Sequence, residues 1–231
     1  MKFLLLFLVL CPILAWGQMW NDDFEDGDIA DWQTYGDGTW GLVSDGSLCL
    51  EQSNSSASDS WAMPDAVDNQ ADYIMTARVK VLGFSSDGAV EILCRMDNGD
   101  IHFGIGHMTG FDGIYIYDDI NGVFADSMTM SISYGEWYHY QAKLQGDDVK
   151  FKVWREGDAE PVDYQLSAVV TGWNAGKIGV RTSNASARWD DLILLEADMP
   201  VPSVGPIGLL ILMLILLLAG GYALRRVYLH A

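Results

Sequence analysis

Apolar and polar side chains alternate with a period of two in several short runs between residues 18 and 196. The clearest runs are DYIMTARVKVLG at 72–83, WYHYQAKLQG at 137–146 and VKFKVWRE at 149–156. In the first run, one side of an extended chain would hold Tyr73, Met75, Ala77, Val79 and Val81. No stretch in this region shows a convincing apolar period of 3.6 residues. The pattern therefore predicts half-buried antiparallel strands rather than helices.

Turn-forming sequences separate these predicted strands. They are Ser-Asp-Gly at 44–46 and again at 86–88, Asp-Asn-Gly at 97–99 and Gly-Asp-Asp at 146–148. Such residues favour turns because glycine adopts positive φ and the side chains of Asp and Asn bond to nearby backbone. About twelve short strands joined in this way predict one all-β domain at 18–197, folded as an antiparallel β-sandwich.

Both ends of the chain differ from this domain. Residues 1–17 contain Lys2, an apolar run at 3–14 and the small-x-small sequence Ala15-Trp16-Gly17, which is typical of a secretory signal peptide. Residues 207–224 form an uncharged apolar run of 18 residues, long enough for a transmembrane helix. The alternative, a buried helix of a soluble core, is rarely apolar all round. A Pro-rich linker at 198–206 precedes the run, and a short basic tail at 225–231 is expected in the cytoplasm.

The exported part is strongly acidic. All 32 acidic residues lie between 18 and 200, together with 10 of the 13 basic residues, which leaves a net charge of −22 there. Such a surface repels phosphate backbones and excludes nucleic acid as a partner. It suits divalent cations or basic partners, although acidity also serves solubility alone.

Two cysteines remain after signal cleavage, Cys49 and Cys94. An oxidising compartment permits a disulfide between them. The sequence does not establish whether their Cα atoms approach within about 7 Å, as a disulfide requires, so both the bridged and the free state stay open.

The sequence DDFEDGDIADWQTYGDGTWGLVSDGSLCL at 22–50 resembles the opening of concanavalin A-like (laminin G-like) jelly-roll domains of bacterial surface proteins. ADYIMTARVKVL, EILCRMDNGDIHFGIG, GEWYHYQAKLQGDDVKFKVW and GKIGVRTSNASARWDDLIL are similar to later strands of that family, in the same order. The resemblance runs from Trp20 to Glu196. It implies two antiparallel sheets, one of them concave, with a glycan ligand on the concave side or the loops. It also implies packing roles for Trp32, Trp40, Trp137 and Trp189.

The C-terminal segment resembles bacterial sorting tails processed by exosortase-type membrane proteases. The resemblance is carried by Val201, Pro202, Gly208, the apolar run, Arg225 and Arg226. The usual Ile-Pro-Thr-Leu opening is replaced by Val-Pro-Ser-Val, Ile207 stands where Trp is usual, and the tail after the arginines is five residues longer than expected. The resemblance implies that the membrane and a sorting protease are partners.

Catalytic and zinc-binding patterns are weak. Jelly-roll glycanases need paired carboxylates on one strand, and no predicted strand carries the Glu-x-Asp-x-(x)-Glu spacing. His102 and His107 share a predicted strand but, five residues apart, point to opposite faces, and the cysteines add no recognised zinc spacing. The sequence therefore predicts a protein that is not an enzyme.

Acidic residues crowd both ends of the domain, at 22–28 and at 190–191. Calcium prefers carboxylate and carbonyl oxygens, and the first and last strands of jelly rolls commonly lie side by side. The predicted ligands of a structural calcium ion are Glu25, Asp191 and Asp23. The alternative is that these carboxylates are solvated turn residues.

A candidate glycan platform lies at FDGIYIYDDINGVF, residues 111–124. If Ile114 and Ile116 face the core, Tyr115 and Tyr117 face outward beside Asp118 and Asp119. Aromatic rings stack on sugar rings while carboxylates accept bonds from their hydroxyls. The further ligand residues predicted on other strands are Arg95, His102 and Trp61.

Together these features predict a non-catalytic, lectin-like protein that binds a polysaccharide or glycoconjugate at the cell surface. The first alternative is a structural or adhesive matrix protein without a defined glycan. The second is a glycoside hydrolase with an unfamiliar site.

Overall fold

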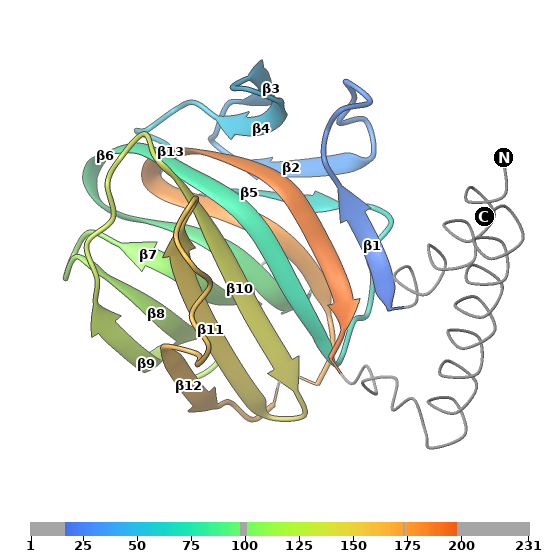
Figure 1. Cartoon of the computed structure of the whole chain (residues 1–231), viewed down its shortest axis with the longest axis vertical. Helices are drawn as coiled ribbons and strands as arrows, with labels where there is room; N and C mark the ends of the chain where they lie inside the picture. The colour runs from blue at the N-terminus through green and yellow to red at the C-terminus, as the bar shows by residue number, and fades with distance from the viewer. Residues whose placement is uncertain (1–16, 98–100, 173, 198–231) are drawn as a thin grey trace, which may run out of the picture. The chain divides into compact units, whose positions relative to one another are not determined.

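The computed structural model describes residues 17–97, 101–172 and 174–197, in which every regular element is a β-strand (Figure 1). The strands are β1 Gln18–Asp22, β2 Trp32–Gly36, β3 Trp40–Ser44, β4 Leu48–Gln52, β5 Ser60–Pro64, β6 Tyr73–Asp97, β7 Ile101–Met108, β8 Gly113–Asp118, β9 Val123–Thr129, β10 Trp137–Gln145, β11 Asp148–Arg155, β12 Leu166–Val169 and β13 Lys177–Glu196. The prediction of an all-β domain is confirmed.

The terminal predictions fall on residues that the structure does not describe. The signal peptide lies there except for its last residue, Gly17, and so do the linker at 198–206, the apolar run at 207–224 and the tail at 225–231. Among the described residues, none belongs to a helix long and apolar enough to span a bilayer.

Two long strands run through both halves of the sandwich. Residues 73–84 of β6 pair with 185–196 of β13, and residues 89–96 of β6 pair with 177–183 of β13. The register shifts between Ser183 and Ala185, where Asn184 adopts φ +48°, a conformation that Asn tolerates better than most residues. The Ser-Asp-Gly sequence at 86–88 was predicted as a turn. That prediction is wrong, because β6 bends there without ending.

The two sheets share these long strands. The back sheet has the order β3-β4-β13-β6-β10-β11-β12, and β1 also pairs with the last part of β13. The front sheet has the order β2-β5-β13-β6-β7-β8-β9. Every pairing is antiparallel, and the predicted contact of the first strand with the last is confirmed.

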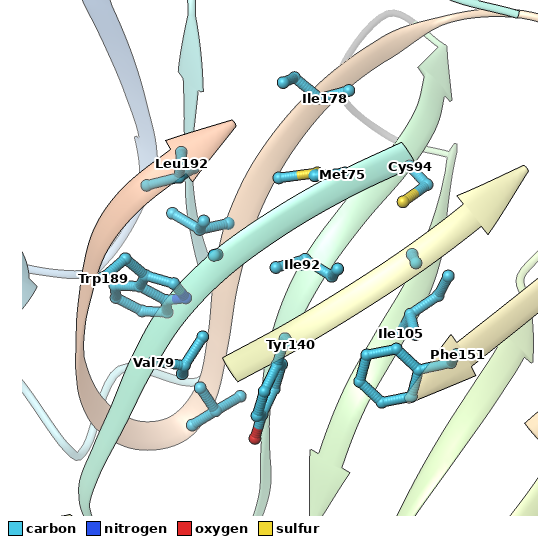
Figure 2. Packing of buried hydrophobic residues seen from close by; sticks show 14 of the residues in the cluster. Met75, Val79, Ile92, Cys94, Ile105, Tyr140, Phe151, Ile178, Trp189 and Leu192 are labelled. Atoms are coloured by element: carbon cyan, nitrogen blue, oxygen red, sulfur yellow. The ribbon is translucent and has the colours of Figure 1, made fainter. Parts of the chain in front are cut away.

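The core lies between the sheets. Figure 2 shows members of its one cluster from both sheets: Met75 and Val79 of β6 and Phe151 of β11 from the back sheet, and Ile105 of β7 from the front sheet. The five residues predicted to share one side of 72–83 are all at most 1% exposed, which confirms the alternation. Three of the four tryptophans predicted to pack are buried, and Trp40 is half-buried against the core.

Both cysteines are free and buried. The Cys49 thiol donates to the Val43 carbonyl over 3.4 Å, and Cys94 packs in the main core. Burial raises the pKa of Cys49 to about 11 and that of Cys94 to about 12. The two thiols are therefore unreactive packing groups near neutral pH.

His107 is a buried titratable group in this core. It lies on β7, paired with Val90 and Ile114, and it is fully buried. Burial lowers its pKa below the ordinary value of 6.5, and Asp112, whose Oδ1 lies 3.5 Å from Nε2, offsets only part of that effect.

We expect His107 to make the domain less stable in mild acid. Below about pH 6.5 the unfolded chain binds a proton that the folded chain does not, so the free energy of unfolding falls by up to about 1.4 kcal/mol per pH unit. The free energy of unfolding is measured with urea at about pH 7.5, 6.5 and 5.5. Plotted against pH, it should have a shallower slope for His107→Gln than for the wild type. The pKa of His139 is also lowered by burial, but His139 is present in both proteins, so the difference belongs to His107. Identical slopes would contradict this account.

Candidate functional site

One row of side chains crosses the outer face of the front sheet. Strand register places Tyr35, Trp61, Arg181, Glu91, Gly106, Tyr115 and Ser127 opposite one another from β2 to β9. The residues that alternate with this row, such as Val90, Ile92 and Val180, belong to the main core. Because side chains alternate across a strand, the row must point away from that core.

A buried ion pair lies at the centre of the row. Arg181 Nη1 contacts Glu91 Oε2 at 2.5 Å, and Arg181 Nε contacts Asp59 Oδ1 at 2.6 Å. The Tyr115 hydroxyl donates to Glu91 Oε1, and Glu91 is only 1% exposed. Burial alone would lower the pKa of Arg181, but the carboxylates of Glu91 and Asp59 more than offset it and raise that pKa. Burial, together with Glu91, also raises the pKa of Tyr115 well above 10, so the phenol stays protonated and donates.

Two glycines of β7 make room for this arrangement. Gly106 separates Tyr115 from Glu91 in the row, and without a side chain it leaves space for the phenol to reach across β7. A methyl group on Gly104 would collide with the Glu91 carboxylate. The alternation Gly104-Ile105-Gly106 therefore gives β7 an outer face of backbone and an inner face that packs in the core.

A pocket of about 370 Å³ opens above this row. Its lining includes Glu91, Tyr115 and Arg181 below, with Tyr117, Phe124 and Asp87 around them. The Phe124 ring lies 5.2 Å from that of Tyr117, 5.4 Å from that of Tyr115 and 5.7 Å from that of Phe111, measured between centroids. Phe124 is 45% exposed, so this aromatic cluster offers an apolar wall to solvent.

A second aromatic pair lies toward the other end of the row. The rings of Tyr35 and Trp61 are stacked, with centroids 5.6 Å apart and planes 12° from parallel. Trp61 is half-buried and packs on the small cluster of Met63, Leu93 and Met96, on the same face. The outer face of the front sheet thus carries aromatic groups on both sides of the Arg181–Glu91 pair.

The structure brings together only part of the predicted ligand set. Tyr115, Tyr117 and Trp61 share the outer face, although Tyr115 is 1% exposed and forms the floor of the pocket rather than its wall. Asp118 does not lie beside them: it pairs with the core residue Phe103 and binds the backbone and side chain of Asn121 in the following turn. The side chain of His102 lies outside the described residues.

Arg95 also lies away from the pocket, because its backbone departs from the regular strand. It adopts φ +51° where the pairing of β6 with β7 shifts register. Its guanidinium is buried and donates to the carbonyls of Ala71 and Gly146, each over 2.8 Å. Arg95 therefore holds two loops together, and a glycan cannot reach its donors.

Glu91, Arg181, Phe124 and Asp87 were not among the ligand residues predicted from the sequence. Glu91 had a signal of its own, because a charge inside the apolar run Ala89-Val90-Glu91-Ile92-Leu93 needs a partner when buried. The glycines at 104 and 106 were a second signal. Phe124 follows a turn and carries no pattern that separates it from an ordinary strand residue.

The predicted calcium ligands do not converge. Glu25 accepts from the Leu48 amide at 2.8 Å, Asp23 accepts from the amide of Glu25, and Asp191 pairs with Arg78 at 3.2 Å. Within the part of the chain that the structure describes, no three Asp, Glu, His or Cys side chains are grouped to hold a metal ion. These carboxylates fit the alternative, in which they are turn residues. Asp23 and Glu25 accept bonds from backbone amides, and Asp191 forms an ion pair with Arg78.

The pocket has no pair of carboxylates placed for glycoside hydrolysis. Of the two carboxylates that line it, Asp87 and Glu91, Glu91 uses both oxygens in the ion pair and the tyrosine bond. The prediction that the Glu-x-Asp-x-(x)-Glu pattern is absent is wrong, because Glu156, Asp158 and Glu160 match it in the exposed segment after β11. Glu156 and Asp158 line a separate pocket of about 380 Å³, and none of the three lines the pocket on the front sheet.

No protein-family model matches the chain, and no curated protein matches it in sequence. Solved structures do match it. The carbohydrate-binding module CBM66 from Bacillus subtilis aligns with a TM-score of 0.56 and 15% identity, over 73% of this chain and 98% of that one. A Bacillus subtilis protein of unknown function with a galectin-like fold aligns with a TM-score of 0.60 and 14% identity, over 78% and 96%. The Ca²⁺-bound exoplasmic domain of VIP36 aligns with a TM-score of 0.50 and 9% identity, over 75% and 86%.

The chain has a concanavalin A-like sandwich fold. Other structures of this fold come from mycobacteria and are described as β-1,3-glucanase or glycosyl hydrolase, and one is described as a pseudo β-1,3-glucanase. Binding modules and hydrolases thus share the sandwich, and similarity at this level shows the fold alone. The function of this chain therefore depends on the residues of its own pocket.

Proposed function

We propose that this domain binds carbohydrate without cleaving it, in the pocket on the outer face of the front sheet. The observation that supports this most is the exposed aromatic wall of Tyr117 and Phe124 beside a fixed network of polar groups. Aromatic faces stack on the apolar faces of sugar rings, while nearby polar groups bond to ring hydroxyls. The similarity to a carbohydrate-binding module and to lectin-like structures agrees with this use of the fold.

We further propose that the domain acts outside the cell. The signal peptide at 1–17 and the apolar run at 207–224 support export followed by membrane anchoring. The likeness of Val201, Pro202 and Gly208 to a sorting signal supports processing by an exosortase-type protease, with release to the surface or matrix. Immunoblotting of membrane, surface and medium fractions tests this. A product found only in the cytoplasm would contradict it.

Binding is tested on residues 18–197, which hold both sheets and the core, by titration with a broad panel of polysaccharides. We expect saturable binding that weakens about tenfold or more in Phe124→Ala and Tyr117→Ala, because stacked rings contribute on the order of 1–2 kcal/mol. Tyr134→Ala is the matched control, since Tyr134 is also exposed but lies outside the pocket lining.

Three results would contradict the proposal. A folded domain that binds nothing on the panel and self-associates would favour a structural matrix protein. Release of reducing sugar, lost on changing one Asp or Glu, would favour a hydrolase. Equal weakening by Tyr134→Ala would place the binding elsewhere.

A further inference from the structure

Negative charge dominates the pocket on the front sheet. Asp87, Glu91 and Arg181 are the charged residues that line it. Arg181 is the only cation among these described lining residues, and it is already held by Glu91 and by Asp59. The four side chains therefore leave two negative charges over, in a chain whose net charge is −19.

Asp87 carries the carboxylate that this network does not use. It lies where β6 bends from the back sheet to the front sheet, and its backbone carbonyl accepts a bond from Asn184 over 3.0 Å. Its side chain is exposed on the pocket lining, and none of the ion pairs among the described residues includes it. Asp87 is thus placed to meet a ligand that enters between it and the aromatic wall.

These groups distinguish ligands by charge. A uronate or sulfate would face Asp87 and Glu91 and find no unneutralised cation, so acidic glycans are disfavoured. An ammonium group would meet a carboxylate on one side and the faces of Tyr117 and Phe124 on the other. Both carboxylates and aromatic faces attract cations, and the two effects add in a partly desolvated pocket.

We propose that this pocket selects glycans with free amino groups, such as de-acetylated hexosamine chains, over neutral and acidic glycans. The inference rests on the proposed function and specifies the charge class of ligand at the same site. Asp87 is its main determinant, with Tyr117 and Phe124 supplying the aromatic face.

The test uses four β-1,4-linked oligosaccharides of equal length, built from glucosamine, N-acetylglucosamine, glucose or glucuronate. Calorimetric titration of residues 18–197 at about pH 6 should show the glucosamine chain binding about tenfold tighter than the glucose chain, with the glucuronate chain weakest. The preference should shrink in about 1 M salt, where the Debye length falls to about 3 Å. In Asp87→Asn the preference should fall to about twofold or less, while binding of the glucose chain is retained. Asp158→Asn, an exposed carboxylate in the turn after β11, should leave the preference intact.

Each other result overturns the inference in an identifiable way. If the glucose chain binds as tightly as the glucosamine chain, or if none of the four binds while a neutral glycan of the panel does, charge selection is wrong and the proposed function stands. If Asp158→Asn lowers the preference as much as Asp87→Asn does, the preference arises from the net charge of the domain and not from the pocket. If nothing in the panel or the series binds to the folded domain, the proposed function fails as well.

Discussion

Replacing Arg181 by leucine is expected to lower the free energy of unfolding by about 3–5 kcal/mol. The substitution would remove the cation that contacts the Glu91 carboxylate, which is 1% exposed, while the Tyr115 hydroxyl still donates to it. A buried charge without its counterion loses hydration and recovers little in return. Glu91→Leu should cost somewhat less, because the Arg181 guanidinium keeps its contact with Asp59, whose side chain is 44% exposed.

The double variant Glu91→Leu/Arg181→Leu separates the ion pair from simple packing. If the two charges matter through each other, the double variant should be less destabilised than the sum of the single variants, by about 1–3 kcal/mol. Urea unfolding of the wild type, the two single variants and the double variant measures this coupling.

Arg155→Leu is the matched control for this cycle. Arg155 pairs with Glu136 at 2.9 Å, but both side chains are about half exposed, and such pairs contribute only about 0–1 kcal/mol. Strictly additive single variants, or a loss at Arg181 no larger than at Arg155, would mean that the Arg181–Glu91 pair is not the electrostatic centre of the front sheet.

The sequence predicts which residues face the core but not how the strands pair. Period-two alternation predicts that Tyr115 and Tyr117 lie on the side of the strand opposite to Ile114 and Ile116. The structure has them on that side. Tyr115 meets Glu91 and Arg181 only because β8, β7, β6 and β13 are neighbours in one register. Register between strands that far apart in the chain comes from the packed core, which a single sequence does not display.

The errors have local physical causes. Ser-Asp-Gly at 86–88 has turn composition, yet the core on either side keeps β6 continuous, and the sequence is used for a bend between sheets. Arg95 was predicted as a ligand residue on a strand near the platform, but a register shift redirects its side chain to loop carbonyls. Acidic residues at the termini suggested an ion site, although Asx-type turns and the contact with Arg78 already engage them.

Trp189→Ala should be the most damaging single change in the core, with a loss of about 3–5 kcal/mol in the free energy of unfolding. Trp189 is fully buried on β13 and paired with Val79 of β6, and Figure 2 shows both side chains. It is also paired with Leu50 of β4, and its ring centroid lies 5.5 Å from that of Trp40. Alanine at this position would leave a large cavity between strands that β13 joins, and the sheets on both sides limit collapse into it. For a domain of this size we expect Tm to fall by about 6–20 °C, measured by thermal unfolding.

Two variants at matched positions show whether burial is the cause. Trp189→Phe keeps an aromatic ring in the site and should recover much of the loss, because the residual cavity is smaller. Trp154→Ala removes a tryptophan that is only half-buried, stacked on His139 with centroids 4.9 Å apart, and should cost about 1 kcal/mol. If Trp154→Ala were as damaging as Trp189→Ala, stability would depend on the outer face of the back sheet. The core between the sheets would then not be the main source of stability. That result would be unexpected, because β6 and β13 run through both of the sheets that enclose the core.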